Sequence, residues 1–276
     1  VLPPYQIKSK TIDEIEKITS LLAIELNVMG LINIQFAYKE NHLYVLEVNP
    51  RASRTIPFVS KSTNVPLAKI AAQLSTGSKL KDYDLPKWNS KKHISIKEAV
   101  LPFNKFPSES IFLSPEMKST GEVMGISKNF GLSFYKATLS AGTLLPNTGL
   151  IFVSVNDQDK FNIISTIRGF SELGFELIAT TGTATELMKN GMNSKTVYKV
   201  GEGRPNIVDY IKNNEISLVI NTPLGAQSRY DEEAIGKACI QKGIMAITTI
   251  SAADAVLHGI RTRHKIQVKS LQEYHN

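Results

Sequence analysis

A carboxylate, an amide and two guanidinium groups lie within one short stretch of this chain. Glu47 ends a segment rich in β-branched and aromatic residues, and Asn49, Arg51 and Arg54 follow it. The composition of the segment predicts a strand, and the Asn-Pro pair after it predicts a turn. Mg²⁺ takes one or two carboxylates together with phosphate oxygens, and arginine binds phosphate through two parallel N–H groups. These residues therefore indicate a site for a metal-bound phosphate.

A second strand, predicted over residues 31–38, brings one more polar side chain to this group. Its interior is apolar except for Gln35. A three-residue hairpin loop, 40–42, centred on Asn41 would set Gln35 opposite Glu47 with both side chains on one face. A two-residue loop would shift the register and separate them. The pattern also fits an ordinary hairpin with one polar residue per strand on a wet face, and the geometry alone leaves both interpretations open.

The sequence GLINIQF at 30–36, followed by YVLEVNPRASRTIPFVSK at 44–61, resembles the end of an ATP-grasp domain. More narrowly, it is similar to the second synthetase half of the large subunit of carbamoyl phosphate synthetases. The stretches at 97–107 and 115–125 continue the resemblance, which then runs nearly to Asn276. We expect a carboxyl-terminal fragment of such a subunit.

The resemblance implies roles for these residues. Gln35, Glu47 and Asn49 hold Mg²⁺ or Mn²⁺ on the phosphates of ATP, and Arg51 and Arg54 act as catalytic residues at the phosphate end of the site. Gln35, Glu47 and Arg51 also contact the ATP phosphates, and K⁺ is a further cation that the family allows. The implied reaction is phosphorylation of carbamate, with ammonia supplied by a glutaminase small subunit. Because no Gly-rich loop or Lys-bearing lobe precedes Val1, we expect this piece alone to be inactive.

Length and composition limit the class of protein. A chain of 276 residues with 42% hydrophobic residues predicts about two domains with proper cores. Neither a membrane-spanning run nor a signal peptide is visible, and the single cysteine fits a reducing compartment, so we expect a cytoplasmic protein. The net charge of +7 comes mostly from residues before 145. The lysines are scattered, which argues for small anionic ligands or a solvated surface rather than nucleic acid.

The predicted fold class is α/β, in two domains. Residues 1–144 are the carboxyl-terminal portion of an ATP-grasp domain, an α+β arrangement with an antiparallel sheet, and residues 145–276 are a Rossmann-like regulatory domain with a parallel sheet. The first domain is predicted to contain a helix at 11–26 with Thr11 as its N-cap, a helix at 66–74, strands at 98–103 and 121–126, and a helix at 130–139.

From Leu150 the pattern alternates between strands and helices, which predicts a parallel sheet with right-handed crossovers. The predicted strands are 150–155, 175–179, 196–200, 218–221 and 245–248; the predicted helices are 161–173, 183–189, 205–212, 230–242 and 251–260.

Ligands of such sheets bind beyond the carboxyl ends of the strands. The residues predicted there could bind phosphate through ammonium groups, hydroxyls and a helix N-terminus. A helix cap with solvated lysines is the plainer alternative. The candidate residues are Lys160, Thr180, Thr183, Lys199, Asn221 and Thr222.

The segments 174–191 and 199–213 resemble the methylglyoxal-synthase-like fold, which in carbamoyl phosphate synthetases is a regulatory domain that binds nucleotide monophosphates. The resemblance places the effector phosphate at Lys160, Thr180, Thr183 and Lys199, with Asn221 and Thr222 nearby. It places the activator ornithine at Glu98, Thr248 and Thr249. We also expect this domain to allow an oligomer to form.

Two departures from the family pattern matter. Pro223 stands where enteric members have a second threonine, which leaves the preferred nucleotide open. The carboxylate base of methylglyoxal synthases is replaced by Ala226-Gln227-Ser228, so independent catalysis of that kind is rejected. An isolated regulatory module without catalysis remains the alternative to a synthetase fragment.

Overall fold

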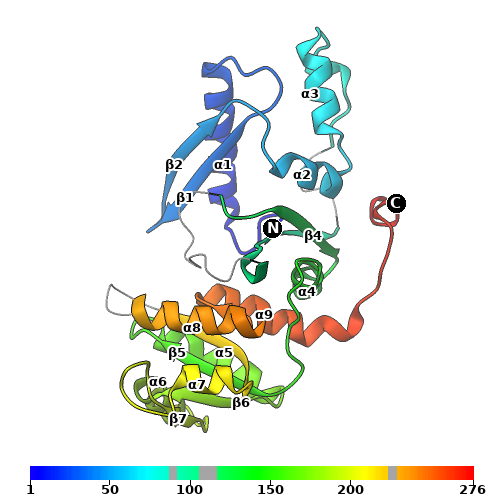
Figure 1. Cartoon of the computed structure of the whole chain (residues 1–276). Coiled ribbons are helices and arrows are strands. Elements are labelled where there is room, and N and C mark those ends of the chain that lie inside the picture. Colours follow the sequence, from blue (N-terminus) through cyan, green and yellow to red (C-terminus); the bar gives the residue numbers. More distant parts are fainter. Residues whose placement is uncertain (87–91, 106–116, 223–228) are drawn as a thin grey trace. The chain divides into compact units, whose positions relative to one another are not determined.

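The computed structural model describes residues 1–86, 92–105, 117–222 and 229–276, in two compact units (Figure 1). The first unit comprises Val1–Ser95 together with Gln267–Asn276, and the second comprises Ile96–Ile266. The domain boundary predicted at 144/145 falls inside the second unit. No helix among the described residues is long and apolar enough to cross a membrane.

The first unit begins with helix α1 (Ser9–Glu25), which starts two residues before its predicted cap. Lys8 holds the N-cap position without a side-chain bond, and Thr11 lies inside the helix, where it is buried. The predicted cap was therefore wrong. Burial of the threonine side chain, not capping, determines its position.

Two short helices follow the hairpin of the first unit. Helix α3 (Leu67–Ser75) has Pro66 at its N-cap, close to the prediction. Helix α2 (Thr55–Thr63) was not predicted, because its nine residues directly follow the arginine-bearing stretch. It ends at Asn64, whose positive φ of 61° closes the helix.

Strands β1 (Asn33–Lys39) and β2 (His42–Asn49) form an antiparallel hairpin. Its loop has two residues, Glu40 and Asn41, with φ of 52° and 63°, so the predicted three-residue loop was wrong. Such a turn has positive φ at both central residues, which asparagine tolerates.

A β-bulge restores the predicted pairing of this hairpin. Phe36 lies opposite Val45, but Gln35 lies opposite Glu47, which leaves Leu46 as the extra residue. The bulge cancels the one-residue shift caused by the shorter loop. Gln35 and Glu47 therefore face each other as predicted, although by a different route.

Strands β3 (Ile94–Val100) and β4 (Gly121–Ser127) form a second two-stranded sheet. Strand β3 starts and ends earlier than predicted, since Pro102 follows it closely. Helix α4 (Phe130–Ser140) then begins at an Asn129 cap, whose side chain accepts a bond from Leu132 N. Among the described residues, single-turn 3-10 helices lie at Leu80–Asp82, Phe103–Lys105 and Arg263–Lys265.

The predicted parallel sheet is confirmed, with strand order β7-β6-β5-β8-β9. Its strands are β5 (Leu150–Val155), β6 (Glu176–Thr180), β7 (Lys195–Val197), β8 (Ile216–Thr222) and β9 (Ala246–Ile247). Its helices are α5 (Lys160–Glu172), α6 (Thr181–Lys189), α7 (Ile207–Lys212), α8 (Arg229–Lys242) and α9 (Ile250–Thr262).

Alternate residues of each central strand supply two separate cores, one on each face of the sheet. In β5, Ile151 and Val153 pack with α5, α6 and α9, whereas Phe152 packs with α7 and α8. Burial on both faces explains why β5 reads as a nearly continuous apolar run. The sheet is therefore a rigid base from which the strand ends present their polar residues.

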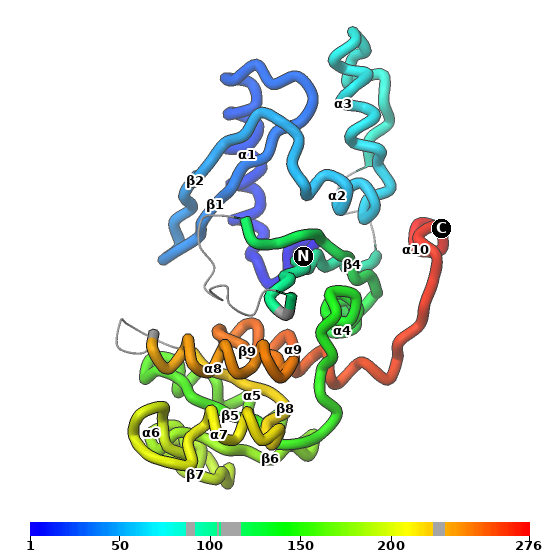
Figure 2. The backbone as a smooth tube through the Cα atoms, in the orientation of Figure 1, coloured from blue at the N-terminus to red at the C-terminus, as the bar shows by residue number. Residues whose placement is uncertain are grey.

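The chain returns to the first unit through a short tail, which Figure 2 traces from α9. Its helix α10 (Leu271–His275) is capped reciprocally by Ser270 and Glu273. His275 Nε2 lies 2.7 Å from the carbonyl oxygen of Lys61 at the end of α2. The buried ring of His93 packs edge-on against His275, with ring centres 5.4 Å apart, so two histidines hold the tail in place.

Candidate functional site

The hairpin brings the three predicted metal ligands to one end of its two strands. Gln35 is directly opposite Glu47, and the Asn49 side chain donates a hydrogen bond to Glu47 Oε1. Glu47 and Asn49 are two positions apart in β2, so their side chains point to the same face. Gln35 and Glu47 are exposed, which leaves their oxygens accessible to a ligand.

The two predicted arginines lie between this face and helix α2. Arg51 Nη1 donates to the carbonyl oxygen of Ala52 at 3.0 Å, which holds the guanidinium close to its own loop. Arg54 is the N-cap residue of α2. Both residues are exposed, and both come within five positions of Asn49.

The chemistry of this donor set suits one kind of cation. In the part of the chain that the structure describes, no three His, Cys, Asp or Glu side chains cluster to hold a metal. One carboxylate with two amide oxygens is too few ligands for a closed protein cage. This donor set fits Mg²⁺, which keeps several waters and takes its other ligands from nucleotide phosphates.

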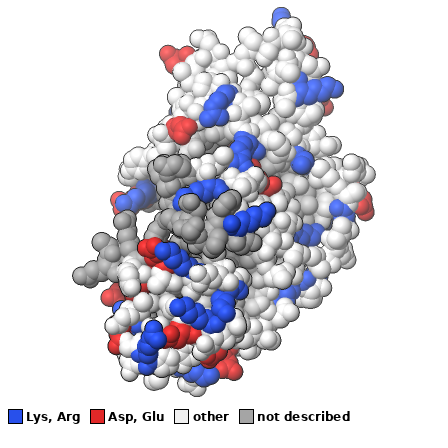
Figure 3. Space-filling view, viewed as in Figure 1, with Lys and Arg blue, Asp and Glu red and all other residues white. Residues whose placement is uncertain are grey.

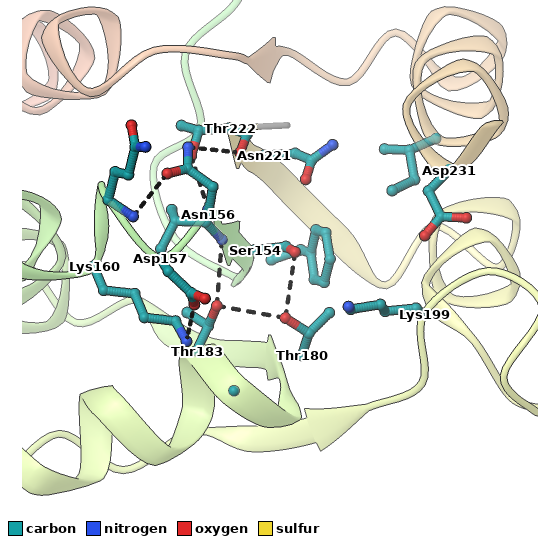
Figure 4. A pocket seen from close by; sticks show the side chains of 15 residues that line it. Ser154, Asn156, Asp157, Lys160, Thr180, Thr183, Lys199, Asn221, Thr222 and Asp231 are labelled. Atoms are coloured by element: carbon teal, nitrogen blue, oxygen red, sulfur yellow. Dashed lines mark hydrogen bonds and ion pairs between the residues drawn. The ribbon is translucent and has the colours of Figure 1, made fainter. Parts of the chain in front are cut away.

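The second constellation surrounds a cavity of about 610 Å³ at the carboxyl edge of the parallel sheet (Figure 4). All six predicted phosphate residues line it. They come from α5, from the junction of β6 and α6, from the segment after β7, and from the end of β8: Lys160, Thr180, Thr183, Lys199, Asn221 and Thr222.

Buried hydroxyls fix the floor of this cavity. Thr180 Oγ1 lies 3.3 Å from Ser154 Oγ and 3.4 Å from Thr183 Oγ1. The backbone N–H of Val155 donates to Thr183 Oγ1 at 3.3 Å. Thr183 is only 2% exposed. Through the bond from Val155, its hydroxyl joins helix α6 to strand β5, and it also lines the cavity.

Asn156 holds the rim in shape. Its side-chain nitrogen donates to the carbonyl oxygen of Thr222 at 3.2 Å and to Asp159 Oδ2 at 2.7 Å. The turn after β5 is thereby tied to the end of β8, its neighbour in the sheet.

Charged side chains of both signs meet in the cavity. Lys160 Nζ lies 2.7 Å from Asp157 Oδ1. The hydrogen bond and charge of Lys160, with a smaller contribution from Lys199, lower the pKa of the Asp157 carboxyl. Burial raises the pKa of the Asp231 carboxyl, against the opposing effect of Lys199.

Sequence reasoning missed several of the polar residues that line the cavity. Ser154, Asn156 and Asp157 stand at the carboxyl end of β5, so the rule that identified the other strand ends could have found them. Asp231 belongs to α8, and only the packing of that helix over the sheet brings it to the cavity.

The residues predicted for ornithine occupy separate elements. Glu98 lies on β3, where burial raises the pKa of its carboxyl. Thr249 Oγ1 caps α9 by accepting from Ala252 N at 3.2 Å, and Thr248 precedes it. Pro223 and the segment Ala226-Gln227-Ser228, on which two further predictions rest, lie outside the described residues.

Two segments of the chain match known protein families. Residues 1–83 match the family described as carbamoyl-phosphate synthase L chain, ATP binding domain. Residues 162–248 match the family described as MGS-like domain, which agrees with the parallel sheet and its cavity.

Similar proteins cover the whole chain. Carbamoyl phosphate synthase large chains of Archaeoglobus fulgidus and Acidobacterium capsulatum are both 49% identical to it over its full length, which spans 26% of each. The protein of Aquifex aeolicus named carbamoyl phosphate synthase large chain, C-terminal section, is 47% identical, and the chain spans 56% of it. By its similarity over all of its residues, this chain belongs to the family of carbamoyl phosphate synthase large chains.

Proposed function

We propose that the chain acts in the ATP-dependent synthesis of carbamoyl phosphate as part of a longer large subunit. The observation that carries this proposal is the hairpin, which gathers Gln35, Glu47 and Asn49 on one face inside the segment that matches an ATP-binding domain. A purely regulatory module fits less well, because such a module has no need of this segment.

In the proposed reaction, an oxygen of carbamate attacks the γ-phosphorus of ATP and ADP leaves. Arg51 and Arg54 bind the oxygens of the transferred phosphoryl group and stabilise its developing charge. Glu47, Gln35 and Asn49 hold Mg²⁺ or Mn²⁺, which neutralises phosphate charge when bound. Carbamate is itself the nucleophile, so the protein positions the reactants and supplies charge. The ammonia that forms carbamate comes from glutamine through a glutaminase small subunit.

The substitution Glu47→Gln in the full-length large subunit tests the metal site. It preserves the shape of the side chain and removes the only carboxylate of the set. We expect the rate of carbamoyl phosphate synthesis to fall about 100-fold or more, as when one preorganised electrostatic group is lost.

Glu40→Gln is the matched control, because Glu40 lies in the turn of the same hairpin and is exposed. Its rate should stay close to that of the unaltered protein. A Glu47→Gln protein that keeps its rate within a few-fold would show that Glu47 does not hold the metal.

For the second unit we propose binding of a nucleotide monophosphate in the cavity at the sheet edge. Lys160 and Lys199 supply positive charge, and the Thr180 and Thr183 hydroxyls can donate to phosphate oxygens. The cavity of about 610 Å³ is the right size for a mononucleotide. Calorimetric titration with uridylate and inosinate tests this, and affinity in the micromolar range is expected because desolvation offsets much of the charge attraction.

A further inference from the structure

One of the side chains that line the cavity, where we propose that phosphate binds, is itself a carboxylate. The Asp157 carboxylate is 2.7 Å from the ammonium of Lys160, and Figure 4 shows this ion pair beside Thr183. The two partners differ in accessibility, since the Asp157 side chain is 93% exposed and the Lys160 side chain only 25%.

The position of the Lys160 ammonium is one that suits a phosphate. A Cβ atom added to Gly182 would lie 3.2 Å from Lys160 Nζ, so the ammonium sits against the first turn of α6. The N–H groups of that turn lack helical partners and favour a negative charge nearby. Lys160 and the start of α6 therefore define one location for an anion, and Asp157 is the carboxylate beside it.

We propose that Asp157 is an internal competitor of the phosphate ligand: its carboxylate pairs with Lys160 while the cavity is empty, and a bound phosphate monoester displaces it. This inference rests on the proposed ligand class. Displacement is easy, because the side chain stands on the turn between β5 and α5 and can rotate into water. The lowered pKa of Asp157 keeps the competitor charged at neutral pH.

The competitor lowers the affinity of the cavity for every phosphate ligand, whatever its base. Lys199 and Asp231 contribute one further charge of each sign to the cavity, and Glu202 Oε2 accepts a bond from the backbone N–H of Lys199. An incoming phosphate therefore meets two ammonium groups that already have carboxylates nearby. Removing the carboxylate that contacts Lys160 should leave that ammonium available to the ligand.

The test is calorimetric titration of the full-length protein with inorganic phosphate, uridylate and inosinate. For Asp157→Asn we expect the dissociation constant of all three to fall by about 2- to 5-fold, the factor that corresponds to one exposed ion pair. Asp159→Asn is the control, because Asp159 carries the same charge on the same turn but bonds to Asn156 rather than to Lys160. It should change each constant by less than 2-fold, because the asparagine keeps a side-chain oxygen that can accept from Asn156 and the ion pair of Asp157 with Lys160 stays intact.

The same titrations with a Lys160→Ala variant, with and without Asp157→Asn, complete a double-mutant cycle. If Asp157 acts through Lys160, adding Asp157→Asn there should have no further effect. Unchanged or weaker binding by the Asp157→Asn single variant overturns the inference, and weaker binding of the nucleotides alone would identify Asp157 as a contact to the sugar or base. Titration of the unaltered protein judges the proposed ligand class separately, since the competitor changes affinity by only a few-fold. If neither the unaltered protein nor the Asp157→Asn variant binds inorganic phosphate, uridylate or inosinate, both proposals fail.

Discussion

Thr183 shows how one side chain serves both stability and binding. Its hydroxyl accepts the N–H of Val155 on strand β5 and lines the cavity at the sheet edge. A buried N–H that loses its acceptor costs free energy, whereas an exposed hydroxyl on the same helix can be removed with little effect. The effect of altering a residue in this cavity therefore depends on its hydrogen-bond partners as much as on the ligand.

We predict that Thr183→Val lowers the free energy of unfolding by about 1–3 kcal/mol, because the shape is kept while Val155 N loses its partner. Thr185→Val on the same helix is the control, since Thr185 is exposed and its hydroxyl donates to the Thr181 carbonyl of its own helix. Urea denaturation measures both. Equal stability of the two variants would show that the Val155 bond contributes nothing.

Cys239 offers a second measurement on a single residue. It is the only cysteine of the chain, it is 1% exposed, and burial raises the pKa of its thiol to about 12. At pH 8 only about one thiol in 10,000 is then the reactive thiolate. We predict no alkylation by iodoacetamide at pH 8 in the folded protein and one equivalent in urea, measured by mass spectrometry. Rapid labelling without denaturant would contradict this packing of α8.

At the scale of elements, close approaches between backbones explain where the sequence places its small residues. Gly125 of β4 lies so near α4 that an added Cβ would be 1.9 Å from the carbonyl oxygen of Ser133 and 2.5 Å from Ala137 N. Both atoms belong to helix backbone, which cannot move aside cheaply. The contact of β4 with α4 therefore requires glycine at this position.

We predict that Gly125→Ala lowers the midpoint of thermal unfolding of the second unit by several degrees or more, since overpacking of this kind costs about 1–3 kcal/mol or more. Gly121→Ala on the same strand is the matched control, because nothing lies within 4 Å of its added Cβ and its φ is not positive. Calorimetry of both variants provides the comparison. Similar midpoints for the two would contradict the packing of α4 on β4.

Elements were easier to predict than the connections between them. The apolar run 150–155 and the regular alternation after it correctly gave the parallel sheet, because both faces of its central strands are buried. The hairpin loop was wrong by one residue, and the bulge at Leu46 that corrects the register has no signal in the local sequence. The pairing of Asp157 with Lys160 was missed for a similar reason, since it depends on the exact path of a turn.

At the scale of the molecule, helix α4 belongs with the sheet that follows it. Phe134 and Tyr135 of α4 pack against the core formed by β5, α5 and α9. A Cβ added to Gly131 would lie 2.3 Å from the His258 carbonyl oxygen, so α4 and α9 cross at close range. Arg263 adds a 2.7 Å bond to the carbonyl oxygen of Pro146. On the face shown in Figure 3, acidic and basic side chains of the described residues lie among one another.

We predict that a piece comprising residues 96–266 folds by itself and is more stable than one comprising 145–266, because the shorter piece exposes the surface of α9 that α4 covers. The difference should be at least about 2–5 kcal/mol, the cost of deleting large buried side chains. Urea denaturation of the two pieces measures it. Equal stability would support a boundary at 144/145.

The return of the tail to the first unit affects how this chain acquires its structure. The bond between His275 and Lys61 joins residues 214 positions apart, and the whole second unit lies between them in the sequence. Closing so long a loop in an unfolded chain costs entropy, and contacts of this range slow folding. The second unit is one continuous segment, so it can fold before the first unit is complete. Once it is folded, the loop that remains to be closed between Lys61 and His275 is effectively shorter. We therefore expect the first unit to be completed late, after the second unit has folded.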